Sequence, residues 1–361
     1  MSKYVRPEIV AMAGYVSGEQ SNQAGVAKLN TNENPYRASE RVYEAIADAA
    51  RLGLAKYPNA TAQPFREAAA KLYGVEPDWV LCGNGSDDIL TILTRTFVGE
   101  KGRIRLSYPT YILYKTLAEL QGATCEMVHF RPDWTLPPEF GCFLGKGEKT
   151  GAPRLAFLAN PNSPSGTVVS NEQIFEAANS LPCPLVVDEA YAEFAGVSCM
   201  DLVKKCEKII CIRTLSKAYS LAGLRFGYAI AQPHLIEQMM KVRDSYNCDA
   251  LSIAAATAAI SDQDWLTENR RKILATRERL VQGMRQLGFD VVDSHANFTW
   301  NTHPTLSGRD IYEHLKANNV LIRYMNYPDW GDGIRISVGT DEQMDRCLSL
   351  VAEIATNRNK K

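Results

Sequence analysis

A lysine flanked by hydroxyl side chains lies within the stretch KIICIRTLSKAYSLAGLRFGY, residues 208–228. The stretch begins with an apolar run of strand length, after which Thr214 and Ser216 precede Lys217, and Arg225 follows. Hydroxyl groups and a guanidinium at the end of a strand can hold a phosphate. A lysine beside such a seat can form an imine with a carbonyl compound. On its own, the stretch is explained equally well by a surface turn with a solvated lysine.

Three further polar turns also come directly after strand-like runs. The glycine turn at 83–87 precedes a predicted helix and so could bind an anion, although many strand-to-helix turns look the same. The loop NPNSPSG, 160–166, contains two prolines and a glycine that fix its backbone, and a purely structural loop would explain it. Asp188 ends an apolar strand, where burial is costly unless the carboxylate meets a cation or hydrogen-bond donors, and Tyr191 follows it.

The elements that would position these residues alternate between strand and helix. Apolar strand-like runs recur between amphipathic segments, at 80–82, 104–107, 125–130, 155–159, 185–188, 209–212 and 226–230. This alternation predicts an α/β domain around a mostly parallel sheet, with its site beyond the carboxyl ends of the strands. From about residue 233 the pattern becomes rich in helices and predicts a smaller α+β domain. Its expected strands are at 289–292, 296–300, 320–323 and 333–338.

We therefore expect three parts in the chain. These are an N-terminal arm of residues 1–37, a large domain of residues 38–246 and a small C-terminal domain of residues 247–361. A chain of 361 residues is long enough for two domains. The arm contains LNTNENPY, 29–36, a polar segment that is either a solvated loop or the lining of a polar pocket.

The composition excludes several classes of partner. Apolar residues make up 45% and charged residues 22%, which is typical of a soluble globular protein. The net charge of −1 and the scattered basic residues give no electrostatic reason to expect nucleic acid or an anionic membrane. No apolar run is long enough for a membrane span or a signal peptide. The nine cysteines show no metal-ligand spacing, so we expect core thiols, no metal site and a cytoplasmic protein.

Taken in order, a set of motifs resembles the fold-type I aminotransferases that use pyridoxal 5′-phosphate, and is most similar to the histidinol-phosphate aminotransferase family. The resemblance extends from about residue 6 to about residue 355. It comprises LNTNENPY, the Tyr-Pro turn at 57–58, GNGSD, YPTY, NPNSPSG, DEAY, SKAYSLAGLRFGY and RISVGT. It implies the fold-type I architecture, a large α/β/α domain with a smaller α+β domain, and a homodimer with shared sites.

The activity implied by the resemblance is transamination between L-histidinol phosphate and 2-oxoglutarate, giving imidazole acetol phosphate and glutamate in histidine biosynthesis. Two activities of the same fold remain as alternatives, an aromatic amino-acid aminotransferase and a threonine-phosphate decarboxylase. A regulator built on this fold would usually carry an N-terminal DNA-binding domain. The residues before the first predicted helix show no helix-turn-helix pattern and no basic excess.

The resemblance also implies roles for the residues around the cofactor. Lys217 would condense with the cofactor aldehyde and then move a proton, which requires a neutral amine. Asp188 would keep the pyridine nitrogen protonated, and Tyr191 would donate a hydrogen bond to the phenolic oxygen. The family has an asparagine directly before the second proline of its NPNNPTG loop, where this chain has Ser163. Either Asn162, which we favour, or Ser163 would therefore meet the same oxygen.

The cofactor phosphate and ring would have their own partners. Backbone amides of the glycine turn, two hydroxyls and a guanidinium would hold the phosphate: Gly85, Ser86, Asp87, Thr214, Ser216 and Arg225. Tyr111 would stack on the cofactor ring. Tyr57 would reach the cofactor phosphate of the neighbouring subunit, unless it is a packed turn tyrosine.

For the substrates, the resemblance points to the arm and to the C-terminal strands. Arg335 would bind the α-carboxylate of glutamate or the phosphate of histidinol phosphate, and Arg323 could join it. The arm residues Asn32, Glu33 and Tyr36 would line the imidazole side of the substrate, unless this segment is structural.

Overall fold

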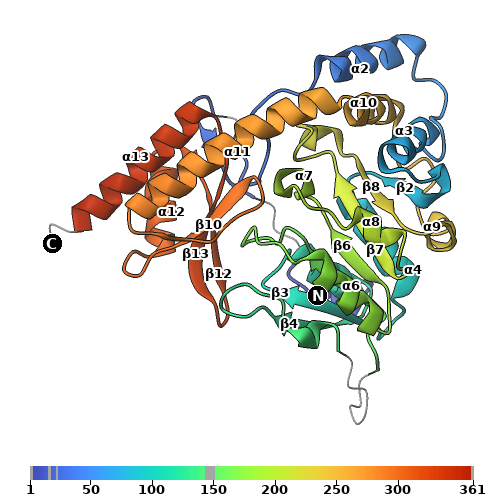
Figure 1. Ribbon diagram of the computed structural model, residues 1–361, viewed down its shortest axis with the longest axis horizontal. Helices are drawn as coiled ribbons and strands as arrows, with labels where there is room; N and C mark the ends of the chain where they lie inside the picture. The colour runs from blue at the N-terminus through green and yellow to red at the C-terminus, as the bar shows by residue number, and fades with distance from the viewer. Residues whose placement is uncertain (1–2, 15–17, 22, 143–150, 359–361) are drawn as a thin grey trace.

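The computed structural model describes residues 3–14, 18–21, 23–142 and 151–358, and a seven-stranded sheet lies at its centre (Figure 1). The strand order is β2-β8-β7-β6-β5-β3-β4. Strand β8 is antiparallel to both of its neighbours, and the other neighbouring pairs of this sheet are parallel. The strands are β2 (Val80–Gly83), β3 (Arg103–Tyr108), β4 (Thr124–His129), β5 (Leu155–Ala159), β6 (Leu185–Asp188), β7 (Ile209–Thr214) and β8 (Gly227–Ile230). The mostly parallel sheet confirms the predicted α/β architecture.

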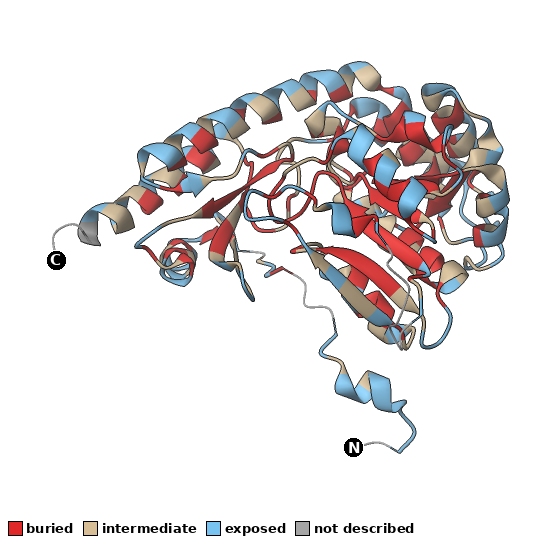
Figure 2. Cartoon of the chain, turned by 60° about the horizontal axis from the view of Figure 1, so that its bottom comes forward, coloured by how far each residue is buried: buried red, intermediate tan, exposed pale blue. Residues whose placement is uncertain are grey.

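Helices cover both faces of this sheet because its strands are apolar on both sides. Alternate residues of one strand enter different cores: Val186 packs in one and Val187 in the other. On the side of Val186 lie α4 (Ser86–Phe97), α5 (Leu113–Leu120) and α9 (Pro233–Met240). On the other side lie α3 (Gln63–Tyr73), α6 (Asn171–Ser180), α7 (Ala192–Ala195) and α8 (Met200–Val203). Figure 2 shows the strands as a buried layer with helices exposed outside them.

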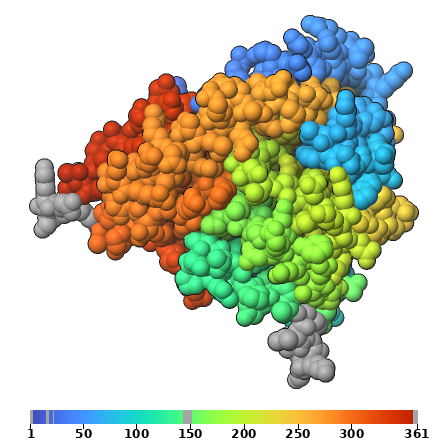
Figure 3. Space-filling model, viewed as in Figure 1, coloured from blue at the N-terminus to red at the C-terminus, as the bar shows by residue number. Residues whose placement is uncertain are grey.

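A smaller unit follows along the chain, with a four-stranded antiparallel sheet of order β12-β13-β10-β9. Its strands are β9 (Asp290–Val291), β10 (Phe298–Thr302), β12 (Arg323–Tyr327) and β13 (Gly331–Ser337). Helices α11 (Gln263–Gln286), α12 (Gly308–Ala317) and α13 (Asp341–Arg358) complete this small unit. The three helices and β13 share a separate apolar core, against which Val291 of β9 packs, whereas Trp300 of β10 belongs to the core of the central sheet. The space-filling view in Figure 3 shows the orange residues of α11 meeting both the small unit and the yellow-green part of the chain.

Two segments connect the parts of the chain. In the arm, β1 (Ala27–Lys28) pairs in parallel with β11 (Val320–Leu321), so the arm is attached to the small unit. Helix α10 (Ala250–Ser261) packs instead against α2 (Glu40–Leu52) and α3, beside the central sheet (Figure 1). The long helix α11 therefore begins next to the central sheet and ends in the small unit.

The observed elements differ from the sequence predictions mainly at their ends. The strand predicted at 320–323 is two strands, because β11 pairs with the arm while β12 pairs with β13. The helix-rich pattern that begins near residue 233 starts with α9, which ends at Met240, and the later Tyr246 adopts a left-handed backbone with φ of 51°. Short helical segments also occur at α1 (Pro7–Ala11), η1 (Pro77–Trp79), η2 (Pro138–Phe140) and η3 (Ala222–Leu224). No helix of the described residues has both the length and the apolar character of a membrane span.

Candidate active site

A cavity of about 340 Å³ lies at the carboxyl ends of β5, β6 and β7 and receives residues from the arm and from the small unit. Because these strands are parallel, their carboxyl ends meet at one edge of the sheet. Most of the predicted site residues line this cavity: Asn32, Glu33, Ser86, Asp87, Tyr111, Asp188, Tyr191, Thr214, Ser216, Lys217, Arg225, Arg323 and Arg335. Four others are outside its lining: Tyr36, Tyr57, Gly85 and Asn162.

Lys217 follows β7 and extends its amine into the cavity. Its Nζ donates to the carbonyl oxygen of Thr31 at 2.9 Å and lies 5.9 Å from the ring centre of Tyr191. Asn34 donates to the carbonyl oxygen of Lys217 at 3.3 Å and so fixes the backbone of this turn. Burial, and after it the positive charge of Arg335, lowers the pKa of Lys217 to about 8. The neutral amine, which is the nucleophilic form, is therefore accessible close to physiological pH.

Asp188 lies at the end of β6 and is 6% exposed. The hydroxyl of Tyr114 donates to its Oδ2 at 2.6 Å, and the backbone N–H of Ala190 donates to Oδ1 at 3.1 Å. Burial raises the pKa of Asp188 to about 6, although both hydrogen bonds oppose that rise. Sequence reasoning missed Tyr114, whose ring stacks on Phe157 with ring centres 4.7 Å apart. Its only signal is the second tyrosine of YILY, three positions after Tyr111.

The start of α4, together with Ser216 and Arg225, forms a part of the cavity that could bind an anion, and we call it the anion seat. Helix α4 begins at Ser86, and the preceding Gly85, with φ of 85°, offers no capping side chain. This positive φ favours glycine, and a Cβ at Gly85 would also lie 2.6 Å from Nη2 of Arg225, which would have to move. The hydroxyl of Ser216 accepts hydrogen bonds from Thr214 Oγ1 at 2.9 Å and from Arg225 Nη1 at 3.4 Å. Helix amides, hydroxyls and a guanidinium together fit a phosphate group.

Two arginines of the small unit face the same cavity. Arg323 on β12 is paired directly with Arg335 on β13, so both side chains lie on one face of the antiparallel sheet. Arg335 Nη1 donates to Ser163 Oγ at 2.9 Å, and Nη2 donates to the carbonyl oxygen of Asn30 at 3.1 Å. Alternate residues on β12 also line the cavity, which adds Met325 and Tyr327. The period of two in RYMNY could have identified both residues from sequence.

Glu33 contributes a negative charge from the arm. Its Oε2 is 2.5 Å from Lys28 Nζ and accepts a hydrogen bond from Thr31 Oγ1 at 2.9 Å. Burial alone would raise the pKa of Glu33, but the hydrogen bonds from Lys28 and Thr31 outweigh it and hold the pKa below its ordinary value. The carboxylate is therefore ionised at neutral pH at the side of the cavity formed by the arm.

Of the two loop residues considered for the phenolic oxygen, Asn162 is outside the lining of the cavity and Ser163 is part of it. The side chain of Asn162 is buried away from the cavity, where Nδ2 donates to the carbonyl oxygen of Pro109 at 3.2 Å and to Ser165 Oγ at 3.0 Å. Ser163, the other residue considered for the same role, lines the cavity. The short loop turns successive side chains to different sides, and their letters alone do not reveal which one faces the cavity.

The two tyrosines outside the lining have different surroundings. Tyr36 packs against the core on the side of α11, with Lys272 Nζ 5.7 Å from its ring centre, so it does not line the substrate cavity as expected. Tyr57 is 80% exposed and stacks on Tyr246 with ring centres 4.5 Å apart. The expectation for Tyr57 concerned the cavity of a neighbouring subunit and stays a prediction.

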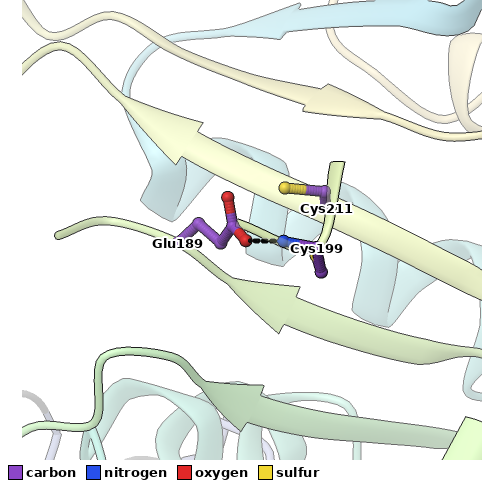
Figure 4. Close-up of side chains that lie close together, drawn as sticks. All are labelled: Glu189, Cys199 and Cys211. Carbon is purple, nitrogen blue, oxygen red and sulfur yellow. Dashed lines mark hydrogen bonds between the residues drawn. The ribbon is translucent and has the colours of Figure 1, made fainter. Parts of the chain in front are cut away.

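Three potential metal ligands, Glu189, Cys199 and Cys211, lie close together around β7, the strand that precedes Lys217 (Figure 4). The carboxylate of Glu189 already accepts hydrogen bonds from the Cys199 N–H at 2.5 Å, from Ser198 Oγ at 2.8 Å and from Arg213 Nη2 at 2.6 Å. Burial raises the pKa of both thiols, whereas metal ligation requires thiolates. The arrangement is therefore explained as a structural junction between β6, β7 and the turn before α8.

The chain is similar over nearly its whole length to known proteins. The family profile described as aminotransferase class I and II matches residues 24–351. A histidinol-phosphate aminotransferase of Rhodopirellula baltica is 53% identical over 355 residues, which are 98% of this chain and 96% of the relative. A histidinol-phosphate aminotransferase of Geotalea uraniireducens is 43% identical over 351 residues, 97% of this chain and 99% of the relative. The crystal structure of histidinol-phosphate aminotransferase from Sinorhizobium meliloti in complex with pyridoxal-5′-phosphate matches with a TM-score of 0.89 and 27% identity, over 99% of both chains.

Proposed function

Because this chain belongs to the aminotransferase class I and II family, we propose that it transfers an amino group between L-histidinol phosphate and 2-oxoglutarate in histidine biosynthesis. The products are imidazole acetol phosphate and glutamate, and the cofactor is pyridoxal 5′-phosphate. One observation carries the proposal: Lys217 with a lowered pKa and the buried Asp188 share a cavity with an anion seat and an arginine pair. This set of groups matches what an amino-group transfer between phosphorylated or carboxylated substrates requires.

The residues of the cavity fit the cofactor. Pyridoxal phosphate, when bound, supplies an aldehyde that condenses with amines and a pyridine ring that accepts electrons from the substrate α-carbon. Ser216, Arg225 and the first amides of α4 would hold its phosphate. Asp188, kept anionic by its hydrogen bonds and by a protonated pyridine nitrogen, would hold the ring in place. Tyr191 and Ser163 would meet its phenolic oxygen.

Lys217 would be the residue that moves the proton. In its neutral form, Nζ would accept the proton from the substrate α-carbon, because its lowered pKa lets it act as a base near pH 8. The carbonyl oxygen of Thr31 and the ring of Tyr191 orient this amine. The cavity wall formed by Met325 and Tyr327 helps to keep water from the reacting atoms.

The arginine pair and Glu33 support the choice of substrates. Arg335 and Arg323 present two guanidinium groups that can bind either a phosphate or a carboxylate, so one site can serve both amino donors. The ionised carboxylate of Glu33 favours an imidazole, which can donate a hydrogen bond or carry positive charge, over a phenyl ring. This observation favours histidinol phosphate over aromatic amino acids. Threonine-phosphate decarboxylation remains the second alternative, since it needs a similar phosphate site.

We also propose that the protein is a cytoplasmic homodimer. The exposed residues Leu52, Leu54, Tyr57 and Tyr246 gather apolar surface around the Tyr57 turn, and a second copy of the chain would cover it. In such a dimer Tyr57 would reach the partner's cofactor phosphate. The nine cysteines, all of them free, are consistent with a reducing compartment.

A substrate panel tests the proposal. The protein loaded with pyridoxal phosphate should convert L-histidinol phosphate with 2-oxoglutarate at a kcat/KM at least 10-fold above that for phenylalanine. The variant Glu33→Gln should lower kcat/KM for histidinol phosphate more than for phenylalanine, because only the imidazole interacts with the carboxylate. Equal rates with both donors, or release of carbon dioxide from threonine phosphate, would contradict the substrate assignment. Lys217→Ala should remove the visible absorbance of the bound cofactor as well as turnover.

A further inference from the structure

Asn32 has surroundings that its sequence context did not suggest. It is 1% exposed and adopts a left-handed backbone with φ of 56°, a conformation that asparagine tolerates better than most residues. Although it lies in the arm, its hydrogen-bond partners come from three other segments. Its backbone carbonyl accepts from Asn297 Nδ2 at 3.0 Å, its side chain contacts Ser337, and its amide nitrogen reaches Tyr191.

The hydrogen bonds around Ser337 define which way the Asn32 amide points. Ser337 Oγ accepts from the backbone N–H of Asn32 at 2.8 Å and donates to Asn32 Oδ1 at 2.9 Å. Because Oδ1 faces the serine hydroxyl, Nδ2 faces the other side, where it donates to the hydroxyl oxygen of Tyr191 at 2.9 Å. The Tyr191 oxygen is therefore an acceptor in this contact, and its own hydrogen has to point away from Asn32.

The direction of this hydrogen matters because Tyr191 lines the cavity. A phenol whose oxygen accepts from an amide can still donate its hydrogen to one acceptor elsewhere. A hydroxyl free to rotate would spend part of its time donating to other groups. The contact with Asn32 removes the orientations in which the hydrogen points toward the arm.

We propose that Asn32 is a positioning residue, which directs the Tyr191 hydroxyl hydrogen toward the cofactor's phenolic oxygen and is held in that role by Ser337 and Asn297 of the small unit. The inference rests on the proposed function and replaces the expectation that the Asn32 amide contacts the substrate imidazole. It assigns to the buried Asn32–Ser337 contact a function beyond joining the arm to β13. The orientation of the Tyr191 hydroxyl would then depend on the contact between the arm and the small unit at Asn32 and Ser337.

The test uses the pH titration of the visible absorbance of the holoenzyme, measured without substrate. A hydrogen bond donated to the ionised phenolic oxygen stabilises the deprotonated chromophore, so its loss raises the midpoint of the titration. Tyr191→Phe should raise the midpoint by about one pH unit, the equivalent of one ordinary hydrogen bond. Asn32→Ala should raise it by roughly half a unit, because the hydroxyl remains but is no longer directed. Asn32→Asp keeps the shape of the side chain but places a hydrogen-bond acceptor where Nδ2 was. This acceptor would draw the Tyr191 hydrogen toward the arm, so the variant should raise the midpoint further than Asn32→Ala.

A double-variant comparison separates positioning from general damage. In a Tyr191→Phe background, Asn32→Ala should add no shift, because the hydroxyl on which it acts is gone. Asn301→Ala is the matched control. Asn301 is a buried asparagine on β10, in the sheet that also contains Ser337, and its side-chain amide donates hydrogen bonds to Thr299 Oγ1 and to the carbonyl oxygen of Ile334. That variant should lose stability without a change in the titration midpoint.

The possible results are distinguishable. If the wild-type band titrates and neither Asn32→Ala nor Asn32→Asp moves its midpoint, the inference is overturned while the proposed function stands. An equal shift from Asn32→Ala with and without the Tyr191 hydroxyl would overturn it as well. A wild-type protein that shows no cofactor band would refute the proposed function itself. Should Asn32→Ala not fold, Asn32→Asp and Ser337→Ala decide the question, and Ser337→Ala should shift the midpoint in the same direction by a smaller amount.

Discussion

Removing the hydroxyl of Tyr114, whose ring lines the cavity, should change the charge of the Asp188 carboxyl. In Tyr114→Phe the ring can keep its stacking on Phe157, while Asp188 Oδ2 loses a donor at 2.6 Å. That distance is typical of a hydrogen bond to an ionised oxygen. Such a bond contributes about 1.5–3 kcal/mol, which corresponds to roughly 1–2 pH units in the pKa of the carboxyl. The pKa of Asp188 should therefore rise from about 6 to roughly 7–8 in the variant.

The shift has a defined signature in the stability of the apoprotein. Asp188 holds its proton more tightly in the folded chain than in the unfolded chain, where its pKa is 3.8. The free energy of unfolding therefore falls as the pH rises from about 4 to about 6 in the wild type. In Tyr114→Phe this fall should continue to roughly pH 8. The variant should match the wild type closely near pH 4 and be less stable by about 1.5–3 kcal/mol at pH 8.

Urea unfolding of the apoprotein at a series of pH values measures this difference, and a second tyrosine provides the control. Tyr219 is buried like Tyr114, but its hydroxyl accepts from Gln263 Nε2 at 3.2 Å instead of donating to a carboxylate. Tyr219→Phe should therefore cause a loss of stability that is constant across the same pH range. If the loss in Tyr114→Phe were also independent of pH, Tyr114 would only fill space and the reasoning about Asp188 would be refuted.

Two further predictions concern buried charges. Burial lowers the pKa of Lys217 from 10.5 to about 8, so the charged amine destabilises the folded apoprotein below pH 8, and this cost disappears as the pH rises toward 10.5. Lys217→Met should therefore stabilise the apoprotein against urea by up to roughly 3 kcal/mol at pH 7 and by little at pH 10.5. Equal gains at both pH values would contradict this account. Arg213 bonds to Glu189 at 2.6 Å and to Glu193 at 3.0 Å, so Arg213→Met should leave two buried carboxylates unpaired and cost about 3–5 kcal/mol of unfolding free energy at pH 7. A loss below about 1 kcal/mol, the range of surface ion pairs, would show that water already reaches this network.

The strands and their polar ends could be predicted because their signals are local. A run such as 185–188 is apolar on both faces and then ends in a carboxylate, and each property is visible within a few residues. The same holds for the glycine turn before α4 and for the hydroxyls around Lys217. Parallel strands place their carboxyl ends at one edge, so locating the strands also brought Ser86, Asp188 and Lys217 together.

The features that sequence reasoning missed depend on contacts between distant segments. Tyr114 was not recognised because its hydroxyl is on α5 whereas its partner Asp188 is at the end of β6, 74 residues later in the chain. Asn162 and Ser163 are neighbours in one loop, and only the folded backbone decides which of them faces the cavity. Asn32 lines the cavity, but its hydrogen bonds to Ser337, Asn297 and Tyr191 join segments that are far apart in the sequence and could not be read from the arm alone.

The arm connects the two sets of residues that line the cavity. The sheet and its helices supply Lys217, Asp188 and the anion seat, but the arginine pair belongs to β12 and β13. The arm joins these two sets, because β1 pairs with β11 of the small unit and, a few residues later, the carbonyl oxygen of Thr31 accepts a hydrogen bond from Lys217 Nζ. Asn34, still in the arm, fixes the backbone of Lys217. The Lys217 amine is therefore oriented by a segment that is attached to the small unit, so that one continuous set of contacts places both Lys217 and the arginine pair at the cavity.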